Sequence, residues 1–280
     1  MLQYKRCKMK KIAILNDIHG NLYLLNKALD YLKKENISLY LICGDFLTDG
    51  PDDNQIIDTL KSLPCEVILG NREESILSIS KEISNLNEKM NPIYYTYLNL
   101  TRENLGYLKS LSSVKQIMID NYKIYMSHGS PYKNTEKVDE SSHELFKKLI
   151  SDYQSDVYLF AHTHKNFNIT YQNKLFINSG AINCFKGQKS VSTFGILTIN
   201  DLLTTYEQIE LPINFEDVKN YYYKSNYYKA FPEWTNIILY IIKYGVNYNS
   251  IFSKEYNSNI SLKENYNNFI KNHNLPGIYK

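Results

Sequence analysis

The sequence predicts an α/β fold in which two β-sheets are sandwiched between helices. Three observations support this prediction. Residues 11–70 alternate between strand-like and helix-like segments, residues 115–199 are rich in predicted β-hairpins, and residues 211–280 change to an aromatic, helix-like texture. A chain of 280 residues is long enough for one domain of this kind and a smaller appendage.

The first half of the chain predicts a parallel sheet with crossover helices. Strands are expected at 11–15, 38–43 and 65–69, and helices at 22–35 and 53–63. This strict alternation is typical of consecutive βαβ units. Residues 73–110 are predicted to be helical because Ile76, Leu77, Ile83 and Leu86 form an apolar stripe, with a break at Pro92.

The second half of the chain predicts a second, hairpin-rich sheet. Its strands are expected at 115–119, 123–127, 157–160, 168–171, 175–178 and 193–199. Asp120–Asn121 and Gln172–Asn173 supply the residue types that tight hairpin turns favour.

The chain after about Leu211 is predicted to be a separate helical unit. We expect residues 1–8 to be a disordered extension, residues 9–210 to be the main domain, and residues 211–280 to be a C-terminal accessory segment. An apolar stripe at helical spacing needs a partner; it consists of Trp234, Ile237, Ile238, Ile241 and Ile242. The partner is either the main domain or a second copy of the chain, which would make the stripe a homo-oligomer contact.

Composition argues against several classes of protein. A net charge of +3 creates no strong field, so dedicated nucleic-acid binding and membrane-surface binding are disfavoured. The apolar runs 12–15 and 237–242 are too short for a signal peptide and a membrane-spanning helix respectively. The four cysteines lie far apart without a CxxC pair, which indicates reduced thiols. We therefore expect a cytoplasmic protein.

Side chains that can bind metal ions follow five of the predicted strands. They are Asp17, His19, Asp45, Asn71, His128, His162 and His164. In an open parallel sheet, ligands bind beyond the carboxyl ends of the strands, so we expect these side chains to converge. Taken singly, each is an ordinary loop or capping residue. Their occurrence together at ordered strand ends favours a metal site.

Spacing and donor chemistry indicate a site for two metal ions. Asp17 and His19, like His162 and His164, are two residues apart. On extended backbone the members of each pair would point to the same side, with about 7 Å between their Cα atoms. Two such pairs can converge on ions roughly 3.5 to 4 Å apart. Imidazole, carboxylate and amide donors without thiolate suit Mn²⁺, Fe, Ni²⁺ or Zn²⁺ in a hydrolytic centre.

Five motifs resemble, in order and spacing, the signature of the calcineurin-like metallophosphoesterases: DIHGN at 17–21, GD at 44–45, GN at 70–71, SHG at 127–129 and AHTH at 161–164. The resemblance spans roughly residues 11–200 and is nearest to small bacterial phosphoesterases and phosphodiesterases. It implies a four-layer α/β/β/α sandwich of two mixed sheets. It also implies a first divalent ion on Asp17, His19 and His164, a second on Asn71, His128 and His162, and a bridge between them from Asp45.

The function implied by this resemblance is hydrolysis of a phosphomonoester or phosphodiester by a metal-activated hydroxide. Asp45, Asn71 and Arg72 are the expected catalytic residues, two Mn²⁺ ions are the first choice of cofactor, and the substrate is expected to be small and phosphorylated. Loops 130–141 and 184–190 are expected to set substrate selectivity. A non-catalytic protein-interaction scaffold on the same fold is the alternative function.

Two residues within the motifs have alternative interpretations. Arg72 stands where much of the superfamily has a histidine; arginine cannot act as an acid, but it can grip phosphate oxygens. The alternative for Arg72 is an exposed residue at a helix start that pairs with Glu73 or Glu74. Asn21 is expected to cap the helix that begins at Leu22, in preference to contacting substrate.

Overall fold

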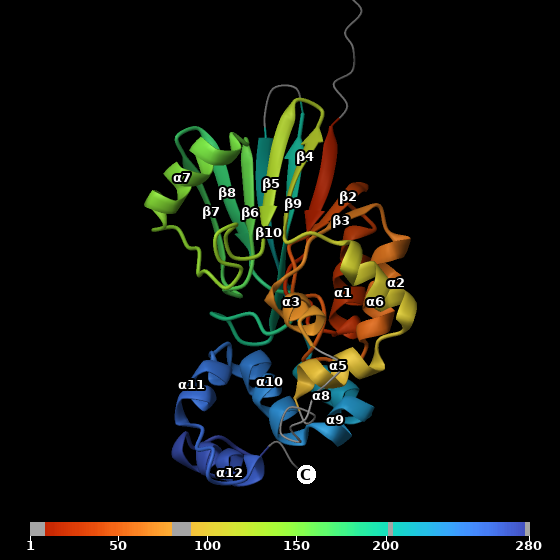
Figure 1. Cartoon of the computed structure of the whole chain (residues 1–280), viewed down its shortest axis with the longest axis vertical. Helices are drawn as coiled ribbons and strands as arrows, with labels where there is room; N and C mark the ends of the chain where they lie inside the picture. Colours follow the sequence, from red (N-terminus) through yellow and green to blue (C-terminus); the bar gives the residue numbers. More distant parts are fainter. Residues whose placement is uncertain (1–8, 80–90, 201–203, 278–280) are drawn as a thin grey trace, which may run out of the picture.

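The computed structural model of the chain describes residues 9–79, 91–200 and 204–277. Two five-stranded mixed sheets lie face to face with helices on their outer sides, and further helices gather at one end of the sheets (Figure 1). This arrangement confirms the predicted α/β/β/α sandwich with a C-terminal helical extension. The predicted extension at 1–8, and the stripe positions Ile83 and Leu86, lie outside the described residues.

The first sheet has the strand order β10-β9-β1-β2-β3. Its strands are β1 (Lys10–Ile14), β2 (Ile37–Ile42), β3 (Cys65–Val67), β9 (Val191–Ile199) and β10 (Thr204–Pro212). β1 pairs in parallel with β2, and β2 with β3, as the alternating sequence pattern predicts. β9 pairs antiparallel with β1, and β10 antiparallel with β9.

Strand β10 is not predicted by the sequence analysis. Ile209 is the one buried side chain along β10, because the strand lies at the edge of its sheet. A strand with so little apolar burial gives a weak hydrophobic pattern. The predicted domain boundary between residues 210 and 211 therefore falls inside β10, and the helical segment begins only at Phe215.

The second sheet has the strand order β4-β5-β6-β8-β7. Its strands are β4 (Val114–Ile119), β5 (Tyr122–Ser127), β6 (Val157–Phe160), β7 (Asn166–Tyr171) and β8 (Lys174–Ser179). The β7–β8 turn has φ values of +47° at Gln172 and +59° at Asn173, which the primed two-residue hairpin turns require. Both predicted hairpins are present.

Apolar cores lie between the sheets and under the helices on each side. Ile12, Ile14 and Met126 belong to the core between the sheets. Their neighbours Ala13 and Tyr125 point the other way and pack in the two outer cores. Successive strand residues face opposite sides, so strands buried on both faces are apolar throughout.

Helices cover the outer face of each sheet. Those in the first half of the chain are α1 (Leu22–Leu32), α2 (Asp53–Ser62), α3 (Asn71–Leu77), α5 (Pro92–Asn99) and α6 (Arg102–Ser110). Helix α7 (His143–Tyr153), which the sequence analysis does not predict, packs Phe146 and Leu149 into the outer core of the second sheet. Pro92 begins α5, in agreement with the predicted break.

Helix α1 begins as predicted but ends early. The side chain of Asn21 accepts a hydrogen bond from the amide of Leu24 at 3.0 Å, which confirms its capping role. The helix ends at Leu32 instead of Glu35. The amides of Lys34 and Glu35 bond to carbonyl groups only three residues earlier, those of Tyr31 and Leu32, so the last predicted residues form tighter turns and not α-helix.

The C-terminal helices pack against the rest of the chain at one end of the sheets (Figure 1). They are α8 (Phe215–Tyr223), α9 (Asn226–Ala230), α10 (Pro232–Tyr244), α11 (Tyr248–Glu255) and α12 (Leu262–Asn272). The four isoleucines of the predicted stripe are at most 3% exposed, so this chain itself covers the stripe. None of the helices in the described ranges is long and apolar enough to cross a membrane.

Candidate metal centre and its pocket

The candidate ligands lie in loops at the carboxyl ends of strands from both sheets. Asn16, which is fully buried, joins these strand ends. Its amide donates to the carbonyl of Phe160 and the hydroxyl of Ser179 at 3.0 Å each, and its carbonyl oxygen accepts from the amide of Cys43 at 3.3 Å. These bonds hold the ends of β1, β2, β6 and β8 together around the site.

Two groups of side chains could each hold a metal ion. The first is Asp17, His19 and His164, and the second is Asp45, His128 and His162. Within each group the ligand atoms lie within 4.8 Å of one another. Asn71 adjoins the second group, with its Oδ1 3.1 Å from Nε2 of His128. Oδ2 of Asp45 lies 3.3 Å from Nε2 of His128 and 4.0 Å from Nε2 of His19, so this carboxylate stands between the groups.

The backbone at these residues differs from the extended form that the spacing argument assumed. Asp17, His19, Asp45, His162 and His164 have φ values between +47° and +67°. Residues other than glycine seldom adopt this left-handed region, and such strain is often retained at functional sites. The expectation of extended backbone is therefore wrong. His162 and His164 nevertheless fall in the two different groups to which the family resemblance assigned them.

Two glycines allow the loops after β2 and β3 to touch. A Cβ atom on Gly44 would lie 2.4 Å from the amide nitrogen of Gly70, and one on Gly70 would lie 2.2 Å from Oδ1 of Asp45. Gly44 also has a φ of +88°. No side chain fits at either position, so the glycines of the GD and GN motifs bring Asp45 and Asn71 side by side.

Backbone carbonyl groups orient two of the histidines. Nδ1 of His128 lies 2.7 Å from the carbonyl oxygen of Cys43, and Nδ1 of His164 lies 3.0 Å from that of Cys184. A carbonyl oxygen can only accept, so Nδ1 carries the proton in each ring. In the neutral ring this leaves the lone pair on Nε2, which faces the centre.

Burial keeps most of these imidazoles neutral. It lowers the pKa of His19 and of His162 to about 4, and it lowers the pKa of His164 well below its usual value. Neutral imidazole is the form that binds metal ions. Burial also opposes protonation of His128, but the Asp45 carboxylate outweighs it and raises the pKa of His128 to about 9. A cation that binds there must displace this proton.

Unpaired donor atoms show that these side chains fit a divalent cation. Asp17 is fully buried, and neither of its carboxylate oxygens has a hydrogen-bond partner among the described residues. Burial raises the pKa of Asp17 to about 7, an effect that the nearby His128 ring only partly offsets. Nε2 of His19 faces Nε2 of His164 at 3.1 Å. Imidazole and carboxylate donors that converge in this way match the ligand needs of a transition-metal ion.

Arg72 lies in the first turn of α3 and reaches the candidate centre. Its Nη2 is 2.9 Å from Oδ2 of Asp49, and its backbone amide donates to Oδ1 of Asp45 at 2.8 Å. Its side chain is only 22% exposed. The alternative of an exposed arginine paired with Glu73 or Glu74 does not describe this geometry.

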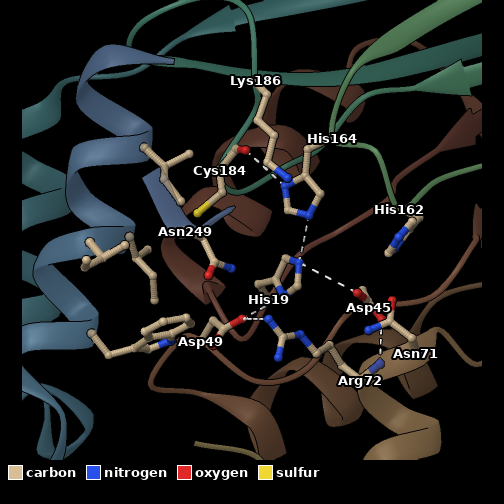
Figure 2. A pocket seen from close by; sticks show the side chains of 14 residues that line it. His19, Asp45, Asp49, Asn71, Arg72, His162, His164, Cys184, Lys186 and Asn249 are labelled. Carbon is tan, nitrogen blue, oxygen red and sulfur yellow. Dashed lines mark hydrogen bonds and ion pairs between the residues drawn. The ribbon is translucent and has the colours of Figure 1, made fainter. Parts of the chain in front are cut away.

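A small pocket of about 130 Å³ opens onto the candidate ligands (Figure 2). Asp49, Trp234 and Asn249 also line it, although the sequence did not predict a place for them at the site. Nε1 of Trp234 donates to Oδ1 of Asp49 at 2.8 Å, and Asp49 also pairs with Arg72. Helix α10 is thereby linked to the loop after β2.

One of the two loops that were expected to set substrate selectivity lines this pocket. The segment 184–190 supplies Cys184 and Lys186 to the pocket, whereas none of the residues that line it comes from 130–141, all of which the structure describes. Helices α10 and α11 form a further part of the pocket wall, through residues such as Trp234 and Asn249. Burial lowers the pKa of Lys186.

Glu73 is a further buried residue that the sequence analysis did not single out. Its carboxylate accepts hydrogen bonds from the amides of Asp45 and Leu47 at 2.9 Å each and from the amide of Gly70 at 2.8 Å. Burial raises the pKa of Glu73 to about 8, although the backbone amides oppose this rise. The spacing of a capping box, with Glu three residues after the N-cap Gly70, is the sequence signal that could have found it.

Comparisons with known proteins agree with the fold and show the family. The sequence model of the calcineurin-like phosphoesterase superfamily domain matches residues 9–202. An uncharacterized protein of Methanocaldococcus jannaschii is 27% identical over 179 residues, which make up 61% of this chain and 69% of that protein. A phosphodiesterase of the same archaeon is 23% identical over 189 residues, which make up 67% of this chain and 92% of that protein.

Two solved structures share the fold. A metallophosphoesterase from Sphaerobacter thermophilus superposes with a TM-score of 0.66 at 16% identity and covers 85% of this chain and 99% of its own. A hypothetical protein from Pyrococcus horikoshii OT3 has a TM-score of 0.68 at 17% identity and covers 84% of this chain and 98% of its own. On the family match over residues 9–202, this chain belongs to the calcineurin-like phosphoesterase superfamily.

Proposed function

We propose that the protein is a phosphoesterase that depends on two divalent metal ions and hydrolyses a small phosphomonoester or phosphodiester. The family and the phosphodiesterase relative support a hydrolase that uses divalent metal ions. One observation carries the two-metal proposal: two groups of buried donors adjoin each other, with the Asp45 carboxylate between them.

The donors divide naturally between two ions. The first ion would be held by Asp17, His19 and His164, the second by Asn71, His128 and His162, and both by Asp45. A shared carboxylate offsets the repulsion between two dications. In such a centre the ions supply a hydroxide nucleophile at neutral pH and neutralise charge on the phosphoryl oxygens. We propose Mn²⁺, with Fe, Ni²⁺ or Zn²⁺ as alternatives, because no thiolate is among the donors.

Two cationic side chains would bind the phosphoryl group. Arg72 and Lys186 both line the pocket, and Figure 2 shows them on either side of the pair formed by His19 and His164. Asp49 engages Nη2 of Arg72, which leaves further guanidinium N–H groups for phosphoryl oxygens. Because arginine does not release its proton, Arg72 would bind and orient the substrate without protonating the leaving group.

Metal analysis and hydrolysis assays of Asp45→Ala test this proposal. We expect two metal equivalents per wild-type chain and Mn²⁺-dependent hydrolysis within a panel of aryl monoesters and diesters, nucleotides, cyclic nucleotides and phosphopeptides. Asp45→Ala should lose hydrolysis and at least one equivalent, whereas Asp30→Ala, an exposed position on α1, should retain both. Full activity and full metal content in Asp45→Ala would refute the assignment. Two bound metals without turnover on the whole panel would favour the scaffold alternative.

Two further proposals concern organisation and location. We propose that α8–α12 form an accessory segment of the catalytic domain, supported by Trp234 and Asn249 in the wall of the pocket. We also propose a cytoplasmic location, supported by Cys43, Cys65 and Cys184, which form no disulfide.

A further inference from the structure

The pocket at the candidate metal centre is too small for a whole organic substrate. Its volume is about 130 Å³. Pockets that bind organic ligands usually measure roughly 300 to 1,000 Å³. The metal pocket can therefore take a phosphoryl group, while the organic part of the ester must lie beyond it.

A second, larger pocket of about 410 Å³ adjoins the first. Asp49, Arg72 and Trp234 line both pockets. These residues form one bonded unit, because Asp49 accepts hydrogen bonds from the guanidinium of Arg72 at 2.9 Å and from the indole of Trp234 at 2.8 Å. A group that leaves the metal pocket past this unit enters the second pocket.

The chemistry of the second pocket selects an uncharged, apolar occupant. Its apolar lining consists of Pro92, Ile93, Phe231, Trp234, Phe252, Tyr256 and Leu262. The charged side chains that line it are Asp49 and Arg72, and these pair with each other. Asp49 and Arg72 also line the metal pocket, whereas the other lining residues are uncharged, so a charged group beyond this junction would lose its hydration without gaining a charged partner, which is costly. Four of the lining residues are aromatic, and aromatic faces and edges favour contact with another planar ring.

We infer that the second pocket binds an aromatic ester group of the substrate while the phosphoryl group occupies the metal pocket. This inference rests on the proposed phosphoesterase function and narrows its substrates to phosphate esters that carry an uncharged planar group. Arg72 stands at the junction of the two pockets, where it can contact the phosphoryl oxygens and the first atoms of the ester group. Trp234 forms part of the wall on the aromatic side.

Binding of two phosphonates to the Mn²⁺-loaded, full-length protein tests the inference. Phenylphosphonate and methylphosphonate share the same charged head but differ in the group that would enter the second pocket. We expect phenylphosphonate to bind at least tenfold more tightly by calorimetry, which corresponds to about 1.4 kcal/mol. Trp234 is the only tryptophan of the chain, so its fluorescence should change on addition of phenylphosphonate and much less on addition of methylphosphonate.

A filled pocket should abolish this preference. Ser253 is an exposed residue of α11 that lines the second pocket, so Ser253→Phe should reduce the ratio of the two affinities to less than about threefold. Ser258 is also exposed but does not line the pocket, and Ser258→Phe should keep the wild-type ratio. Equal affinities in the wild type, or an unchanged ratio in Ser253→Phe, would overturn the inference.

Metal content and hydrolysis, measured on the same preparations, separate this inference from the proposed function. Two bound metals and turnover without a preference for phenylphosphonate would overturn the aromatic subsite alone. A preference for phenylphosphonate without turnover would overturn the proposed function but retain the subsite. Absence of bound metal, together with absence of binding of both phosphonates, would overturn both.

Discussion

Replacement of Glu73 by alanine should destabilise the protein and disturb its candidate metal centre at the same time. The Glu73 carboxylate is fully buried and accepts hydrogen bonds from the amides of Asp45, Leu47 and Gly70 at 2.8 to 2.9 Å. Each buried N–H group that loses its partner costs about 1 to 3 kcal/mol, so the three together cost about 3 to 9 kcal/mol. Loss of a buried carboxylate offsets part of this cost. We therefore expect the free energy of unfolding to fall by about 3 kcal/mol.

Urea unfolding of the metal-free protein measures this loss without any contribution from bound ions. Glu74→Ala is the matched control, because Glu74 is the next residue of the same helix. Its carboxylate accepts one hydrogen bond within the described residues, from the hydroxyl of Ser113. We expect the control to lose about 1 kcal/mol or less. Metal content should fall in Glu73→Ala only, since Glu73 holds the loop that carries Asp45. A Glu73→Ala protein within about 1 kcal/mol of the wild type, with full metal content, would refute this reasoning.

Three other predictions concern the pocket, a buried carboxyl group and the C-terminal helices. Arg72→Ala should lower kcat/KM for aryl esters about 10- to 100-fold with both metals retained, because it removes the charge-assisted hydrogen bond proposed between Arg72 and the phosphoryl oxygens. Unchanged kinetics would exclude a role for Arg72 in the pocket. Burial raises the pKa of Asp53 to about 7. The contribution of this group to the free energy of unfolding is therefore fully present below pH 3.8, the pKa of the unfolded chain, and is lost as the pH rises through 7. The thermal midpoint of Asp53→Asn should therefore rise relative to that of the wild type between pH 5 and pH 8. The corresponding change in the free energy of unfolding is at most about 3 kcal/mol, and a difference in midpoint that shrinks would contradict this. Truncation after Ile213 preserves β10 but uncovers the apolar surface under α10, so size-exclusion chromatography should show aggregation; a monodisperse truncated protein of equal thermal stability would show that the helices are dispensable.

The motif residues could be predicted from the sequence because each motif is a short segment close to the end of a strand. Gly44–Asp45 and Gly70–Asn71 come shortly after β2 and β3, and the glycines are required where the two loops touch. Continuous apolar runs marked the strands that are buried on both faces, and turn residues such as Asn173 marked the hairpins. Edge strand β10 was not predicted because Ile209 is its one buried residue, which leaves little hydrophobic pattern in the sequence.

The local geometry of the site could not be predicted from spacing. His162 and His164 were expected on extended backbone, yet both have positive φ values. The loop after β6 adopts this strained form because contacts from elsewhere in the chain hold it, such as the carbonyl of Cys184 on Nδ1 of His164. Strain that distant contacts impose leaves no periodic pattern in the sequence.

By itself the sequence determined the fold class, the superfamily resemblance and the identity of seven candidate ligands, because strand periodicity and short motifs are local properties of the chain. Only the tertiary structure decided that Asp49 meets both Arg72 and Trp234, a residue 185 positions further along the chain. It also decided that α10 and α11 complete the pocket and that an aromatic second pocket adjoins it. The physical reason is that the apolar face of α10 shows that the helix must be buried but does not show which surface covers it. The packing of the whole chain determines that surface.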